Sequence, residues 1–151
     1  MQTKFTGTAE FGNAIGSVGN FIGDAERISS CIPDSRNFAK KDDTHFSIVA
    51  EMGLGAVKGE IPLRCAIEKA GNSQYLYLIE GHSFGSNVKV KLVLNLQDNG
   101  GSSTQINWDL SMELTGIIGA MGESAILHFA ETYVDKIITN VKKEMAANKN
   151  R

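Results

Sequence analysis

The sequence predicts an α+β domain, in which a curved antiparallel sheet has its apolar face covered by helices. Five segments of the 151-residue chain alternate apolar and polar residues, which is the period of a half-buried strand. In the clearest segment, every second residue from Ile106 to Leu114 is apolar. Apolar residues recur at helical spacing instead from Ile117 to about Met145, which predicts one long helix. At about 1.5 Å per residue, this helix is long enough to cross the whole sheet.

The N-terminal part of the chain predicts a strand followed by two short helices. The strand runs from about Lys4 to Phe11, and the segment Gly12–Gly23 then has apolar residues at helical spacing. Asp24 is a suitable N-cap for a second helix, Ala25–Cys31. Pro33 ends that helix, because a proline disfavours helical geometry in the residue before it.

About six strands are then expected between Phe38 and Leu114. Short segments rich in glycine, asparagine and aspartate separate them, and such segments favour turns between antiparallel neighbours. We expect a single domain over residues 1–146 and a frayed basic tail over 147–151.

Composition excludes several classes of function. Fifteen basic and seventeen acidic residues give a net charge of −2, so no basic surface is expected to attract nucleic acid. Cys31 and Cys65 have neither CxxC spacing nor nearby histidines, so no metal site and no cofactor are predicted. The segment Met1–Phe5 lacks the apolar core of a signal peptide, and no apolar run is long enough to span a bilayer. These features are typical of a cytoplasmic protein.

Three motifs, in order along the chain, carry a resemblance to a known family. They are the triplet Cys31-Ile32-Pro33 after Asp24, the glycine-rich segment Gly53–Gly59, and the strand Thr104–Trp108 followed by the glycine-rich segment Gly116–Gly122. The order of elements resembles the helix-grip fold of the polyketide cyclase, START and pollen-allergen (SRPBCC) superfamily. Within that superfamily, the motifs are similar to those of the CoxG family of carbon monoxide dehydrogenase subunits.

The resemblance implies a non-enzymatic accessory protein. Such a protein assists a molybdenum-containing dehydrogenase and holds an apolar ligand, such as a quinone or a lipid, in a cavity. The strands agree with this, because their inward side chains carry almost no titratable groups, so no catalytic residue is predicted. Lys142, Lys143, Lys149 and Arg151 complement the helix dipole at the C-terminus and imply at most weak peripheral contact with a membrane.

Seven residues are expected to line the cavity, chosen from strand parity and nearness to its mouth: Ile32, Leu54, Phe84, Trp108, Met112, Met121 and Leu127. The glycine-rich segment is expected to form the cavity rim, through Gly53, Gly55, Val57, Lys58 and Gly59. It lacks the Gly-Lys-Ser/Thr ending of a phosphate-binding loop, and a strand pattern follows it rather than a helix.

Two alternative functions remain open at this stage. A cyclase-like or hydrolase-like enzyme would use the same cavity, with His82 or a tyrosine as acid or base. A pure protein-interaction module would fill its interior with its own side chains. Periodicity also leaves one orientation undecided, because Tyr75 and Tyr77 alternate with Leu76 and Leu78, and either pair suits an apolar face.

Overall fold

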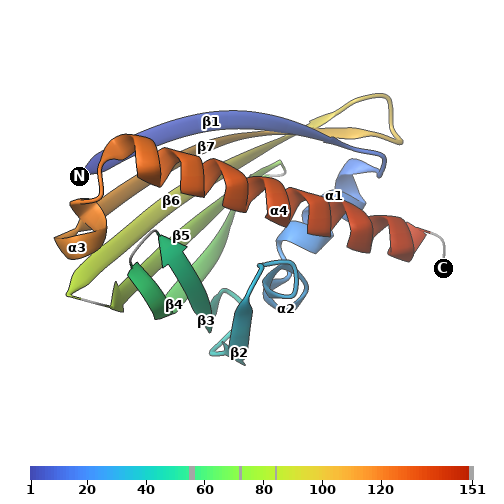
Figure 1. The fold of residues 1–151 in the computed structure, drawn as a ribbon. Coiled ribbons are helices and arrows are strands. Elements are labelled where there is room, and N and C mark those ends of the chain that lie inside the picture. The colour runs from blue at the N-terminus through green and yellow to red at the C-terminus, as the bar shows by residue number, and fades with distance from the viewer. Residues whose placement is uncertain (55–56, 72, 84, 150–151) are drawn as a thin grey trace.

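Seven antiparallel strands form one sheet in the computed structural model, in the order β1-β7-β6-β5-β4-β3-β2 (Figure 1). The structure describes residues 1–54, 57–71, 73–83 and 85–149, with the backbone alone at 52–54, 57–58 and 148–149. The predicted class and the antiparallel sheet are confirmed. The strands are β1 (Gln2–Phe11), β2 (Ser35–Lys40), β3 (His45–Leu54), β4 (Val57–Ala70), β5 (Gln74–Ser83), β6 (Ser86–Asp98) and β7 (Thr104–Thr115).

The register of the sheet confirms that alternate residues share one face. Trp108 on β7 lies between Gly7 on β1 and Leu94 on β6. Apolar residues at the matching positions of the other strands are buried, among them Ile61 and Ile106. The concave face of the sheet is therefore apolar across its whole width.

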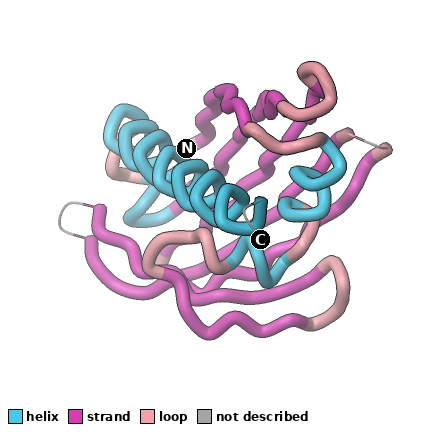
Figure 2. Tube along the Cα trace, turned by 90° about the vertical axis from the view of Figure 1, so that its right-hand side faces the viewer, coloured by secondary structure: helices cyan, strands magenta, loops and turns pink. Residues whose placement is uncertain are grey.

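The helices gather on that concave face, and the longest of them crosses it (Figures 1 and 2). They are α1 (Ile15–Ile22), α2 (Ala25–Ser29), α3 (Gly116–Gly119) and α4 (Glu123–Lys149). Two helices thus stand where the sequence predicted one from Ile117 to Met145. The break lies at Gly122, whose φ of 96° falls in a region that other residues rarely adopt.

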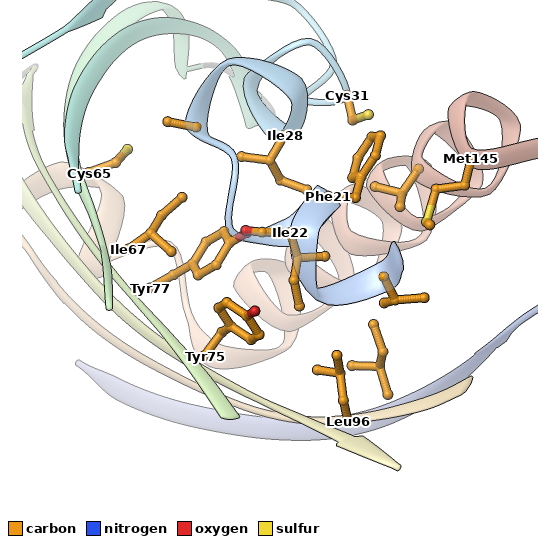
Figure 3. Close-up of a cluster of buried hydrophobic side chains, with 14 of the residues drawn as sticks. Phe21, Ile22, Ile28, Cys31, Cys65, Ile67, Tyr75, Tyr77, Leu96 and Met145 are labelled. Carbon is orange, nitrogen blue, oxygen red and sulfur yellow. The ribbon is translucent and has the colours of Figure 1, made fainter. Parts of the chain in front are cut away.

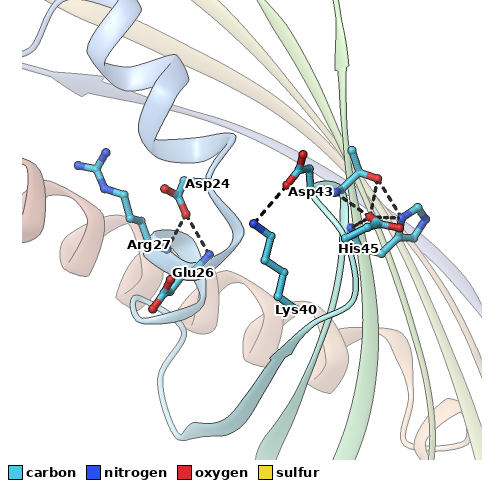
Figure 4. A network of polar contacts seen from close by, with 8 residues as sticks. Asp24, Glu26, Arg27, Lys40, Asp43 and His45 are labelled. Carbon is cyan, nitrogen blue, oxygen red and sulfur yellow. Dashed lines mark hydrogen bonds and ion pairs between the residues drawn. The ribbon is translucent and has the colours of Figure 1, made fainter.

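Local polar contacts fix the start of α2 and the turn between β2 and β3 (Figure 4). The Asp24 side chain accepts hydrogen bonds from the backbone nitrogens of Glu26 and Arg27, at 3.1 and 3.2 Å, which confirms the predicted N-cap. In the turn, Asp42 accepts a hydrogen bond from the backbone nitrogen of His45 at 2.8 Å. A hydrogen bond with the His45 ring lowers the pKa of Asp42.

Two clusters of buried side chains hold the layers together. The larger one joins the sheet to α1, α2 and the C-terminal half of α4, and Figure 3 shows Phe21, Tyr77 and Met145 among its members. The smaller cluster packs Leu114 and Ile118 against Ile126 near the start of α4. Partly buried residues, rather than fully buried ones, occupy the sheet between the two.

Candidate ligand-binding cavity

An apolar cavity of about 140 Å³ lies between the sheet, the α1–α2 pair and the C-terminal half of α4. Strands contribute one wall, and α4 contributes the opposite one. Its lining residues are Ala9, Phe11, Ile22, Ile28, Ile32, Tyr77, Ile79, Leu92, Leu94, Ile106, Trp108, Val134, Ile137, Ile138 and Val141. Among these residues only Tyr77 carries a titratable group.

The tyrosines of β5 face inward, which settles the orientation that periodicity left open. Tyr75 and Tyr77 are buried, whereas Leu78 is 37% exposed on the opposite face. The Tyr77 hydroxyl donates a hydrogen bond to the backbone carbonyl of Ile22. Burial also raises the pKa of Tyr77, so its hydroxyl stays protonated. The one polar group of the lining that titrates is therefore already engaged by α1.

Trp108 forms part of the wall because β1 has a glycine beneath it. A Cβ placed on Gly7 would lie 2.2 Å from Cζ2 of the indole, so any larger residue would displace the ring. The indole Nε1 is buried and has no hydrogen-bond partner, and no other buried side-chain nitrogen or oxygen of the described residues shares that condition. A buried donor without a partner is uncommon and costly in folded proteins.

Two side chains of α4 hold the segment after α2 against the helix. The Tyr133 hydroxyl donates to the carbonyl of Pro33, and Nδ2 of Asn140 donates to the carbonyl of Cys31, both at 2.9 Å. Burial raises the pKa of Tyr133 to about 12, which keeps the hydroxyl a donor at neutral pH. Ile32 stands between the two tethered carbonyls and lines the cavity.

The size of the cavity limits what it holds in this conformation. Ligand sites for drug-sized molecules are typically about 300–1,000 Å³, whereas an apolar cavity of about 150 Å³ accommodates benzene. A volume of about 140 Å³ therefore admits one ring. A larger molecule requires α4, or the segment that it tethers, to move away from the sheet.

The structure brings two of the seven predicted lining residues, Ile32 and Trp108, into the cavity wall. Met112 and Met121 instead pack on the smaller cluster near the start of α4. Leu127 is half-buried on α4 and is not part of the wall. Two predicted lining residues fall where the structure gives no side-chain description: Leu54 and Phe84.

The predicted rim is a tight hairpin between β3 and β4. Gly53 pairs with Lys58, and Leu54 pairs with Val57, so only residues 55–56 connect the strands. Gly59 follows at the start of β4 with a φ of 154°. Gly55 lies outside the described residues, as do the side chains of Val57 and Lys58, so their contact with a ligand stays a prediction.

The remaining chemically reactive side chains lie away from the cavity or are buried. His82 is on the outer face of β5, with its Nδ1 2.6 Å from Oδ1 of Asn87. Burial raises the pKa of the thiols of Cys31 and Cys65. In the part of the chain that the structure describes, no three metal-ligating side chains gather, and no helix is long and apolar enough to cross a membrane.

Most of the wall was not predicted, although the sequence contained signals for it. Val134, Ile137, Ile138 and Val141 form the apolar stripe of the predicted long helix, and every one of them lines the cavity. Ile106 belongs to the clearest predicted strand. The missing information was the depth at which α4 crosses the sheet, because strand parity fixes a face but not a position along it.

A curved sheet that grips a long helix over an apolar cavity is the helix-grip architecture of START-like proteins. Solved structures agree with this class: a conserved protein from Geobacillus kaustophilus gives a TM-score of 0.88 at 20% identity, over 96% of each chain. A START superfamily protein from Mycobacterium smegmatis gives 0.72 at 15% identity, over 93% of this chain and 95% of that chain. The Zhui aromatase/cyclase from Streptomyces gives 0.66 at 9% identity, over 100% of this chain and 97% of that chain.

The chain belongs to the CoxG family of carbon monoxide dehydrogenase subunits, whose family model matches residues 7–146. The resemblance carried by the three sequence motifs is thereby confirmed. Among proteins with curated descriptions, none matches the chain in sequence.

Proposed function

We propose that this protein is a non-enzymatic binder of an apolar small molecule, a quinone or a lipid, which it holds between the sheet and α4. The observation that carries the proposal is the cavity wall, which is apolar apart from one engaged tyrosine hydroxyl and one indole. Acid–base catalysis needs a titratable group within reach of the substrate. The wall formed by the described residues offers only Tyr77, whose hydroxyl is already bonded to Ile22.

The size of the cavity favours a ligand that has a ring and a tail. An aromatic ring buries roughly 150–250 Å², which is worth about 5 kcal/mol, or a Kd near 0.2 mM before the costs of association. A single ring would therefore bind weakly. A quinone with an isoprenoid tail, or a lipid with an acyl chain, adds apolar area once α4 or its tethered segment moves.

Family membership supports a role beside a larger enzyme complex. A protein of the CoxG family is expected to assist a molybdenum-containing dehydrogenase of the carbon monoxide dehydrogenase type. In this proposal the protein works in the cytoplasm and makes at most weak peripheral contact with a membrane. Lys142 and Lys143 are exposed near the end of α4, where about 1 kcal/mol per basic residue would give only transient attachment to anionic lipid.

The test is a fluorescence titration with ubiquinone-1, a quinone with a short tail. Trp108 is the only tryptophan in the chain, so its emission reports on the cavity wall directly. We expect saturable quenching at one quinone per chain, beyond the quenching of N-acetyltryptophanamide at equal absorbance. The His82→Ala variant should bind equally well, because His82 lies on the other face of the sheet. Absence of saturable binding of both ubiquinone-1 and oleate would contradict the proposal.

A further inference from the structure

The indole of Trp108 is a hydrogen-bond donor that the fold itself leaves without a partner. Its Nε1 is buried, whereas the other buried side-chain polar atoms that the structure describes are bonded. The Tyr77 hydroxyl, in the same wall, is bonded to a backbone carbonyl. The wall thus contains one satisfied donor and one donor that is free to bond with a ligand.

The position of the indole is fixed rather than accidental. Gly7 has no side chain, and the ring lies directly on that glycine, with Nε1 2.9 Å from the site where a Cβ would stand. Trp108 also pairs with Gly7 in the ladder between β1 and β7, so the strand register holds the two together. A phenylalanine would fill the wall at this position without carrying an unpaired donor.

We infer that Trp108 recognises a carbonyl oxygen on a ring at the buried end of the ligand. This inference rests on the proposed function and adds the class and orientation of the ligand: a quinone or aryl ketone that enters ring first, with its tail toward the opening. A fatty acid does not fit that orientation, because burying a carboxylate beside a single neutral donor is costly. The ester groups of a lipid stay at its polar end, which remains nearer to solvent.

The first experiment compares two probes of the same shape on the wild-type protein. Acetophenone carries a carbonyl, and α-methylstyrene has a methylene group in its place. Methyl signals of Ile32 and Ile137, which line the cavity, report binding of either probe by NMR. The single indole N–H signal reports the hydrogen bond. We expect both probes to shift the methyl signals and only acetophenone to move the indole proton downfield.

The second experiment measures the affinities of both probes for the wild type and for Trp108→Phe. Any loss of packing in the variant affects both probes, so the ratio of their affinities isolates the donor. We expect Trp108→Phe to shift that ratio against acetophenone by about two- to tenfold, the range for one net hydrogen bond. The NMR comparison needs no variant and keeps the inference testable if Trp108→Phe fails to fold.

The outcomes separate the inference from the proposed function. If both probes bind and the indole signal responds identically to each, the carbonyl has no role and the inference is overturned, while the cavity remains a binding site. If neither probe shifts the methyl signals at millimolar concentration, the cavity does not bind ligands and both claims fail. A downfield shift with acetophenone alone supports both.

Discussion

Filling the cavity from the sheet side should stabilise the protein and block its ligand. Ala9 on β1 lines the cavity, and its neighbour in the ladder, Ile106, lines it as well. The Ala9→Leu variant adds three carbon atoms that point toward the empty volume. The wall would then gain contacts that the wild-type protein lacks.

The magnitude follows from the volume. An apolar cavity costs about 24 cal/mol per Å³, so 140 Å³ corresponds to about 3.4 kcal/mol. The added atoms fill roughly half of it, which is worth about 1.7 kcal/mol. Ordering a leucine side chain costs about 0.5–1 kcal/mol. A net gain of about 1 kcal/mol remains, equivalent to a rise in Tm of about 2–4 °C for a chain of this size.

Urea denaturation of ligand-free protein measures the change, and the ubiquinone-1 titration measures binding. Ala66→Leu is the matched control, because Ala66 pairs with Leu78 on the outer face of the sheet. We expect Ala9→Leu to gain stability and lose quinone binding, and Ala66→Leu to do neither. If Ala9→Leu lowered the free energy of unfolding by more than about 1 kcal/mol, the site would be densely packed. That result would favour an interaction module.

Three further predictions test other parts of the account. Gly7→Ala should push the Trp108 indole off β1, with a loss of about 1–3 kcal/mol in urea denaturation and a shift in the wavelength of tryptophan emission; an unchanged spectrum would contradict the packing. Asp24→Ala removes the N-cap of α2 and should cost about 1 kcal/mol, seen as a fall in Tm of about 2–4 °C, while an unchanged Tm would deny the cap any role. Burial raises the pKa of Cys65 from 9.0 to about 12, so the folded state holds this proton more tightly than the unfolded state. Stability should be full below pH 9 and fall as the pH rises toward 12, and Cys65→Val should flatten that fall in alkaline urea titrations; an equal slope in both proteins would refute the assignment.

Strand parity predicted the sheet well because each strand has one apolar face and one polar face. The run from Ile106 to Leu114 shows this, since polar residues fill every outward position. Parity failed at β5, where Tyr75 and Tyr77 alternate with leucines and both sets are apolar. Tertiary contacts decided that orientation, through burial under α1 and the bond from Tyr77 to Ile22.

The cavity wall was harder to predict because it depends on contacts between distant parts of the chain. Met112 lies on the correct face of β7, but the wall stops short of it and includes Trp108. The tethers from Tyr133 and Asn140 join residues 100 and 109 positions apart, a relation that local patterns do not contain. Gly122 illustrates the opposite case, because a glycine beside the apolar stripe was visible and its role as a helix break was not anticipated.

The most direct test of the account is native mass spectrometry of the purified protein, followed by organic extraction of whatever it holds. We predict a co-purifying quinone or lipid at near one molecule per chain, lost in the Ala9→Leu variant. A mass equal to that of the bare chain, unchanged after incubation with quinones and lipids, would contradict the claim that this cavity binds an apolar ligand.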